Sequence, residues 1–171
     1  MFYNKVTELF ENKSLFAELV DEIDTRKFEF EEEWTTGEWK GGINTRIIIL
    51  KRKEELDNQK AFAVLYKYIL LYWEGWEPDF VMYNNESDRK KWKESLKDGW
   101  IPNYFPERDL TLKMIDVNKF FEYGDFEVDP NGDFKKIVLK SKMIEITGYN
   151  NVLYFGMTDE VYFYLETIHN A

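Results

Sequence analysis

Residues 55–74 constrain the fold of this chain more than any other segment, because they predict a helix that is apolar around most of its circumference. Asp57 or Asn58 can cap the start of this helix, and Gly75 can end it. An isolated surface helix would leave much of this apolar area in water, which is unfavourable. The segment is therefore expected to lie buried between other layers of structure.

Two segments before this helix predict a β-hairpin. Residues 43–53 contain the run Ile47 to Leu50, whose mainly β-branched side chains favour a buried central strand. Residues 26–34 alternate around two phenylalanines and predict the partner strand. Residues 35–42 contain three glycines and are expected to form the turn or a mobile loop.

The C-terminal third of the chain predicts mostly β structure. The turn sequence DPNG at residues 129–132 is expected to join a short strand, residues 126–128, to a long strand that begins at Phe134. The apolar alternation of that strand changes phase near Ser141, which indicates a bulge. Two further strands are predicted at residues 110–115 and 152–157.

Three other segments have helical periodicity or caps. Residues 4–23 place their apolar side chains largely on one face and predict an amphipathic helix with an irregularity near residues 12–14. Residues 87–97 predict a short, strongly charged helix, followed by an irregular connector at residues 98–109. Thr158 can cap a final helix.

The predicted fold class is α+β, with residues 1–171 forming one domain. A chain of 171 residues with 44% hydrophobic and 33% charged residues can bury a sizeable core. We expect a mostly antiparallel sheet with an N-terminal amphipathic helix, a buried central helix and a short C-terminal helix.

Acidic residues outnumber basic residues by 33 to 23, which gives a net charge of −10. This charge repels phosphate backbones and anionic lipid, so neither nucleic acid nor a membrane is expected as a direct partner. Basic proteins would be attracted, although the same charge could serve only to keep the protein soluble. Glu8 and Glu11 lie where a signal peptide needs an apolar run, so a cytoplasmic location is expected.

The sequence contains no recognisable catalytic, metal or cofactor motif. Cysteine is absent, the only histidine is His169 near the C-terminus, and no glycine-rich phosphate loop occurs. The segment that starts at Asp129 fits a calcium loop poorly, because Phe134 and Lys140 stand where that pattern needs glycine and glutamate. No metal ion or cofactor is therefore expected.

Two segments combine tryptophans with carboxylates, and we call them the first (residues 31–39) and second (residues 73–79) acidic-aromatic segments. Tryptophan and tyrosine rings supply much of the contact energy at protein interfaces, and carboxylates can pair with arginines of a basic partner. The predicted partner-binding residues are Glu31, Glu32, Glu33, Trp34, Trp39, Trp73, Glu74, Trp76, Glu77 and Asp79.

The sequence favours a protein that binds and neutralises a basic partner, such as an immunity component of a toxin pair or an inhibitor encoded by a phage or plasmid. The alternative is a small hydrolase-like enzyme or ligand-binding domain with an aromatic pocket around Trp73 and Trp76. In that case Glu74, Glu77 or Asp79 would act as general base. A third possibility is an assembly subunit whose rings bury against other copies, since the sequence does not fix the oligomeric state.

Overall fold

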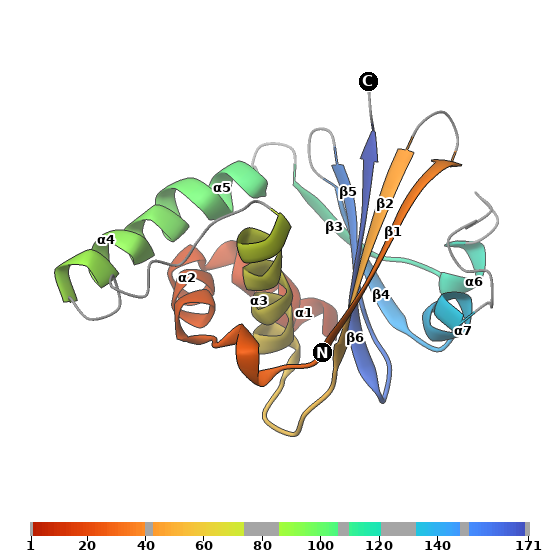
Figure 1. Ribbon diagram of the computed structural model, residues 1–171, viewed down its shortest axis with the longest axis horizontal. Helices are drawn as coiled ribbons and strands as arrows, with labels where there is room; N and C mark the ends of the chain where they lie inside the picture. The colour runs from red at the N-terminus through yellow and green to blue at the C-terminus, as the bar shows by residue number, and fades with distance from the viewer. Residues whose placement is uncertain are drawn as a thin grey trace.

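A six-stranded antiparallel sheet forms the central layer, in the strand order β1-β2-β6-β5-β4-β3 (Figure 1). The computed structural model describes residues 2–39, 43–73, 86–105, 110–120, 133–147 and 151–169, and all structural statements below refer to these residues. The strands are β1 (Phe30–Trp39), β2 (Ile43–Lys51), β3 (Thr111–Met114), β4 (Lys142–Thr147), β5 (Asn151–Met157) and β6 (Val161–His169).

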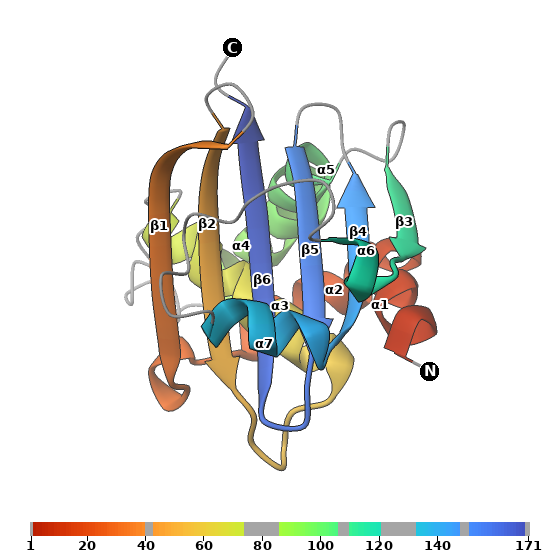
Figure 2. The same ribbon diagram turned by 90° about the vertical axis from the view of Figure 1, so that its right-hand side faces the viewer.

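Helices cover both faces of the sheet (Figures 1 and 2). One face carries α1 (Phe2–Glu11), α2 (Lys13–Glu22), η1 (Thr25–Lys27), α3 (Asn58–Tyr68), η2 (Ile69–Trp73), α4 (Glu86–Ser95), η4 (Leu96–Trp100) and α5 (Ile101–Tyr104). The opposite face carries α6 (Val117–Phe120) and α7 (Asp133–Leu139). The predicted α+β fold with a mostly antiparallel sheet is confirmed, and the single-domain organisation stays a prediction.

The N-terminal amphipathic helix is confirmed, together with its irregularity. The helix breaks at Asn12 into α1 and α2, and the Asn12 side chain accepts a hydrogen bond from the backbone N–H of Leu15 at 3.1 Å. This cap satisfies one of the N–H groups that the start of α2 leaves without a helical partner. The break lets each half turn its own apolar face toward the core.

The buried central helix is also confirmed. The Asp57 side chain caps α3 by accepting from the backbone N–H of Lys60 at 2.8 Å. Seven consecutive residues of α3, 61–67, are buried, so the helix is enclosed on all sides. Phe62 contacts Phe155 of β5 and Phe16 of α2, with ring centroids 5.0 and 5.7 Å apart. The helix therefore lies between the sheet and the N-terminal helices, as its sequence requires.

A smaller core fills the space between the sheet and α7. Phe134 and Val138 of α7 are buried against this face, and the Phe134 ring packs edge-on against Phe163 with centroids 5.6 Å apart. Gly156 pairs with Phe163 across β5 and β6. A Cβ atom at Gly156 would lie 2.1 Å from the Phe163 ring, so glycine leaves the space that this ring occupies.

The hairpin of β1 and β2 is confirmed, but its first strand is shifted toward the turn. Residues 25–27 form a 3₁₀ turn, and β1 continues through residues 35–39, which were expected to lie in the turn. The pairing between β1 and β2 becomes irregular between Thr35 and Trp39. This irregularity accommodates Gly37 within the strand, which propensity alone would place in a loop.

The predicted final helix is wrong, because residues 161–169 form β6 in the middle of the sheet. Alternate residues of β6 face the two separate cores, with Tyr164 on the α3 side and Phe163 on the α7 side. A strand that is covered on both faces carries apolar residues without strict alternation and resembles a helix in sequence. Thr158 begins a tight turn instead, and its hydroxyl accepts the N–H groups of Glu160 and Val161.

The predicted long strand from Phe134 is also wrong. Residues 133–139 form the helix α7, and the strand β4 begins only at Lys142. The change of phase near Ser141 is therefore the junction between a helix and a strand, where the Ser141 hydroxyl donates to the carbonyl of Val138 at 2.7 Å. The predicted turn at 129–132 and strand at 126–128 lie outside the described residues.

The charged helix predicted at residues 87–97 is confirmed as α4 and η4, and it extends farther than expected. Residues 98–104, predicted as part of an irregular connector, continue the helix as η4 and α5. Pro102 lies in the first turn of α5, a position that tolerates proline. Trp92 and Leu96 are buried on the inner face of this helical segment.

Candidate functional site

The first acidic-aromatic segment lies on β1, which is an edge strand of the sheet. Glu31 and Glu32 are exposed to solvent. Within the described part of the chain, β1 pairs with β2 alone, and the outer side of an edge strand carries backbone groups without a strand partner. The side chains of Glu33, Trp34, Trp39 and Trp73, and the whole of Glu74, Trp76, Glu77 and Asp79, lie outside the described residues.

A ladder of three aromatic rings connects β1 to the end of α3, and we call it the ring ladder: Phe30, Tyr68 and Tyr72. The centroids of Phe30 and Tyr68 are 4.4 Å apart, and those of Tyr68 and Tyr72 are 4.6 Å apart. Phe30 packs against the core, whereas Tyr72 is 59% exposed. The ladder therefore leads from the interior to the surface, where Tyr72 directly precedes Trp73, the first residue of the second acidic-aromatic segment.

The carboxylate of Glu32 is tied to this ladder. Partial burial and a hydrogen bond to Glu32 raise the pKa of Tyr68 well above its usual value, so its phenol stays protonated and donates to the carboxylate. Glu32 pairs with Ile48 of β2 and shares the α3 face of the sheet, whereas Glu31 pairs with Ile49 and shares the α7 face. The two exposed carboxylates thus flank the edge of the sheet from opposite sides.

The ring ladder links Phe30, the residue before the first acidic-aromatic segment, through Tyr68 to Tyr72, the residue before the second. The residues of the alternative aromatic pocket, from Glu74 to Asp79, lie outside the described residues. That alternative stays a prediction.

The sequence analysis missed a buried polar cluster between α5 and the sheet. The Tyr104 hydroxyl donates to a carboxylate oxygen of Glu166 at 3.2 Å and lies 3.2 Å from the Tyr164 hydroxyl. Glu166 is only 4% exposed and pairs in register with Arg46 on β2. Burial, followed by the nearby Tyr104 and Glu166, raises the pKa of Tyr164 well above its usual value. The cluster therefore holds a carboxylate against hydrogen-bond donors within an apolar layer.

No sequence pattern could have revealed this cluster, because its members come together only through the register of the sheet. The residues after Thr158 were expected to form a helix with Val161, Tyr164, Leu165 and Ile168 on its inner face, which left Glu166 without a predicted role. The one available signal was Arg46, a charged residue directly before the apolar run of a strand expected to be buried. Its in-register neighbour Glu166 provides charge of the opposite sign.

The part of the chain that the structure describes includes no group of three His, Asp or Glu side chains that could hold a metal ion. Among the helices described, none has both the length and the apolar character that crossing a bilayer requires. Comparison of the chain with protein-family models, with curated proteins and with solved structures found no match.

Proposed function

We propose that the chain is a protein-binding module that receives an extended, basic segment of its partner along the outer edge of β1. The observation that carries this proposal is the placement of Glu31 and Glu32 on opposite sides of one edge strand. A partner that docked on one face of the sheet would meet only one of the two carboxylates. A strand added to the edge would pass between them and could pair with both.

Three further features support an added strand. The edge strand has ten residues, which is long enough for several main-chain hydrogen bonds. The ring ladder ends beside it at the exposed Tyr72, which offers apolar contact area next to the carboxylates. The net charge of −10 would speed up the approach of a basic partner.

The same carboxylates disfavour a second copy of this chain as the partner. Antiparallel pairing of two β1 edges would bring glutamates of one copy close to glutamates of the other, and like charges at such positions destabilise a sheet. A role as an inhibitor, or as the immunity component of a toxin pair, fits this selectivity, because it requires a basic partner rather than self-association.

A peptide titration tests the proposal. The probe is a ten-residue peptide of valine and threonine with two adjacent central arginines, and the matched control carries glutamates in place of the arginines. We expect the arginine peptide to bind, and E31K/E32K to weaken its binding at least tenfold. The matched variant E54K/E55K reverses two exposed carboxylates in the turn after β2 and should bind within twofold of wild type. Equal binding of both peptides, or equal loss in both variants, would contradict the proposal.

A further inference from the structure

The hydrogen bonds of the first hairpin determine which backbone groups of β1 point outward. The N–H of Lys51 donates to the carbonyl of Glu29 at 3.1 Å, and the register of the hairpin places these two residues opposite each other. They form a hydrogen-bonded pair, and such pairs alternate with non-hydrogen-bonded pairs along antiparallel strands. The backbone N–H and C=O groups of Phe30, Glu32 and Trp34 therefore point away from β2, whereas those of the residues between them point toward it.

The neighbouring pair of strands gives the same assignment. The N–H of Arg52 donates to the carbonyl of Glu160 at 3.0 Å, across the pairing of β2 with β6. Lys51, one residue earlier, must then turn its backbone groups away from β6 and toward β1. Its bond to Glu29 agrees with this direction, so two separate hydrogen bonds support one assignment of the outer edge.

The opposite edge of the sheet is less suited to receive a strand. β3 has four residues, and the N–H of Ile115 donates to the carbonyl of Met143 at 3.1 Å. By the same alternation the backbone groups of Leu112 point outward. The carbonyl of Leu112 already accepts a hydrogen bond from the Tyr3 hydroxyl of α1 at 3.1 Å. A strand added to β3 would have to displace this contact, which makes β1 the better receiving edge.

Three consecutive positions of β1 offer different surroundings to an added strand. Glu32 and Phe30 lie on the α3 face of the sheet with the ring ladder, and Glu31 lies between them on the α7 face. Glu31 forms no ion pair with any residue that the structure describes, whereas Glu29 is paired with Lys51 at 3.4 Å. Read backward along the chain, the edge presents a carboxylate, a second carboxylate and an aromatic ring.

Both carboxylates are placed to select basic side chains. Because the backbone of Glu31 points toward β2, a partner residue opposite Glu31 forms a non-hydrogen-bonded pair, with Cα atoms about 4.5 Å apart and side chains close together. A partner residue opposite Glu32 forms a hydrogen-bonded pair. The Glu32 carboxylate is already oriented by its hydrogen bond to Tyr68, which lowers the cost of ordering it in an ion pair.

The third position selects an apolar side chain. Phe30 is half-buried, and its ring leads through Tyr68 to Tyr72, which is 59% exposed. A partner residue opposite Phe30 lies on the face of the ring ladder, and side chains at such cross-strand positions are in contact. A large apolar or aromatic residue at that position would remove part of these rings from water, which is favourable.

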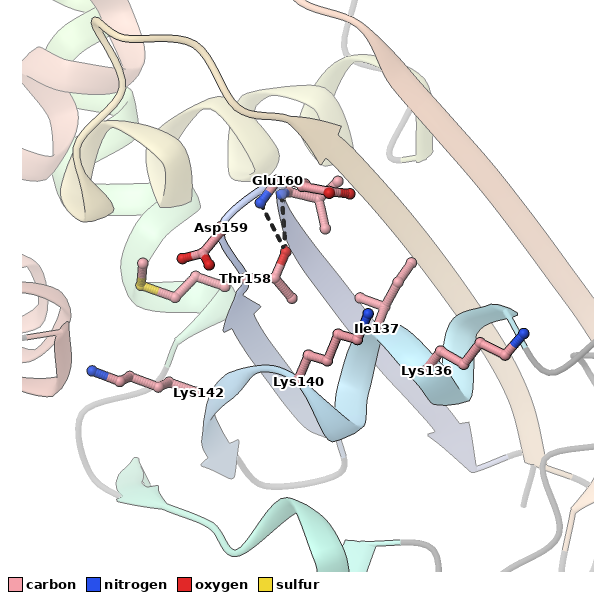
Figure 3. Close-up of a pocket in the computed structure, with 9 residues that line it drawn as sticks. Lys136, Ile137, Lys140, Lys142, Thr158, Asp159 and Glu160 are labelled. Atoms are coloured by element: carbon pink, nitrogen blue, oxygen red, sulfur yellow. Dashed lines mark hydrogen bonds between the residues drawn. The ribbon is translucent and has the colours of Figure 1, made fainter.

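Another pair of adjacent acids lacks this arrangement. Asp159 and Glu160 are exposed in the turn between β5 and β6, and they line a pocket of about 400 Å³ that is also lined by three lysines, Lys136, Lys140 and Lys142 (Figure 3). The N–H of Glu160 is bonded to the hydroxyl of Thr158. A basic strand would meet lysines in this pocket and a backbone group that is already used, so exposed acids alone do not form a receiving edge.

We infer that the partner's strand runs antiparallel to β1 and reads basic, basic, large apolar from its N-terminal to its C-terminal side, opposite Glu32, Glu31 and Phe30 in that order. Antiparallel addition continues the pattern of the sheet and is the more stable pairing per residue. This inference rests on the proposed function, because it specifies the orientation and the sequence pattern of the strand that this function requires.

Two ten-residue peptides of equal composition test the pattern. Both consist of valine and threonine around a central triplet, which is Arg-Arg-Phe in one and Phe-Arg-Arg in the other. We expect Arg-Arg-Phe to bind at least fivefold more tightly, because only this order places the phenylalanine beside the ring ladder in an antiparallel strand.

Two aromatic variants test the contact with the ring ladder. Tyr72→Ala should weaken binding of the Arg-Arg-Phe peptide at least threefold, and it should leave binding of an Arg-Arg-Thr peptide within twofold. Trp100→Ala removes another exposed ring and is the matched control, which should leave both affinities within twofold of wild type. Circular dichroism checks that both variants are folded.

A charge swap measures the orientation. Glu31→Lys should weaken binding of the Arg-Arg-Phe peptide at least fivefold. In an antiparallel strand the second arginine lies opposite residue 31, so an Arg-Glu-Phe peptide should bind this variant within threefold of the wild-type affinity for Arg-Arg-Phe. A Glu-Arg-Phe peptide should not restore binding. In a parallel strand the first arginine would lie opposite residue 31, and only Glu-Arg-Phe would restore it.

The outcomes separate this inference from the proposed function. Absence of binding by every arginine peptide would refute the proposed function and the inference together. Restored binding by Glu-Arg-Phe, equal affinities for Arg-Arg-Phe and Phe-Arg-Arg, or an equal loss from Tyr72→Ala for Arg-Arg-Phe and Arg-Arg-Thr would overturn the inference alone. In the expected complex, NMR should show a nuclear Overhauser effect between the α-protons of Glu31 and the second arginine, which a parallel strand would not give.

Discussion

The ring of Phe30 packs against the ring of Tyr68 with centroids 4.4 Å apart, and this contact fixes the edge strand β1 to the end of the central helix. It joins two segments that are far apart in the sequence, each of which leads into one acidic-aromatic segment. The position of the proposed binding edge therefore depends on an aromatic contact that reaches into the core.

Truncation of Phe30 should loosen this edge. We expect Phe30→Ala to lower the free energy of unfolding by about 2 kcal/mol, because a half-buried phenyl ring loses its packing. Tyr68→Phe keeps the ladder and removes only the hydrogen bond to Glu32, so it should cost about 1 kcal/mol. Urea denaturation followed by circular dichroism measures both. A loss from Phe30→Ala no larger than that from Tyr68→Phe would show that the ring contact does not hold β1.

Gly156 should be intolerant of even one added methyl group. Gly156→Ala places a Cβ atom 2.1 Å from the Phe163 ring, and we expect it to lower the free energy of unfolding by about 3 kcal/mol. Gly99 is the matched control, since a Cβ there meets no atom within 4 Å and Gly99→Ala adds helix propensity, so that variant should be neutral or slightly stabilising.

A double-mutant cycle identifies the cause of the Gly156 effect. Phe163→Leu shortens the opposing side chain, so Gly156→Ala should cost at least 1 kcal/mol less in that background. Thermal unfolding of the four proteins gives the coupling energy. Simple additivity of the two substitutions would rule out a direct clash between the two residues.

The buried carboxylate of Glu166 should be needed for stability. Glu166→Ala leaves the Tyr104 hydroxyl without this acceptor and Arg46 without its in-register carboxylate, and it should cost about 3 kcal/mol. Glu166→Gln keeps an oxygen acceptor at the same place and should cost less than Glu166→Ala. Chemical denaturation measures the free energy of unfolding of both variants. Equal losses from Glu166→Ala and Glu166→Gln would contradict this role of the Glu166 carboxylate.

Alkaline pH should destabilise the protein through Tyr164. Its pKa is raised in the folded state above the usual 10.0, so above that pH the unfolded chain loses the phenol proton while the folded protein keeps it. The unfolded state then binds fewer protons, and the free energy of unfolding falls as pH rises. Tyr164 alone contributes up to about 1.4 kcal/mol per pH unit above pH 10. Denaturation of wild type and Tyr164→Phe from pH 7 to 11 should show a shallower alkaline decline in the variant.

The sequence predicted those elements in which one periodicity dominates. The apolar stripe of residues 4–23, the Asp57 cap and the apolar run of Ile47 to Leu50 each agree with the structure. Prediction failed for β6, because both of its faces are covered and a two-sided apolar strand has no clear period. The prediction failed for α7 because this helix has only seven residues, or about two turns. So short a segment does not show the helical period clearly enough to distinguish a helix from a strand.

The candidate site was predictable in its composition but not in its geometry. The combination of carboxylates and large rings is visible in the sequence, and Glu31 and Glu32 are exposed in the structure, while the binding role of these residues stays a prediction. The ring ladder and the Glu166 cluster depend on which strands are neighbours and in what register. Such long-range information is fixed by the packing of the whole core, so neither Tyr68 nor Glu166 could be assigned a role beforehand.

Hydrogen–deuterium exchange of the β1 amides, measured with and without the arginine peptide, tests the central claim most directly. If the peptide adds a strand to the sheet, the outward-facing amides of residues 30–39 should exchange at least tenfold more slowly when it is bound, while amides of the opposite edge strand β3 keep their rates. Unchanged exchange in β1 at saturating peptide, or protection confined to other elements, would contradict the account.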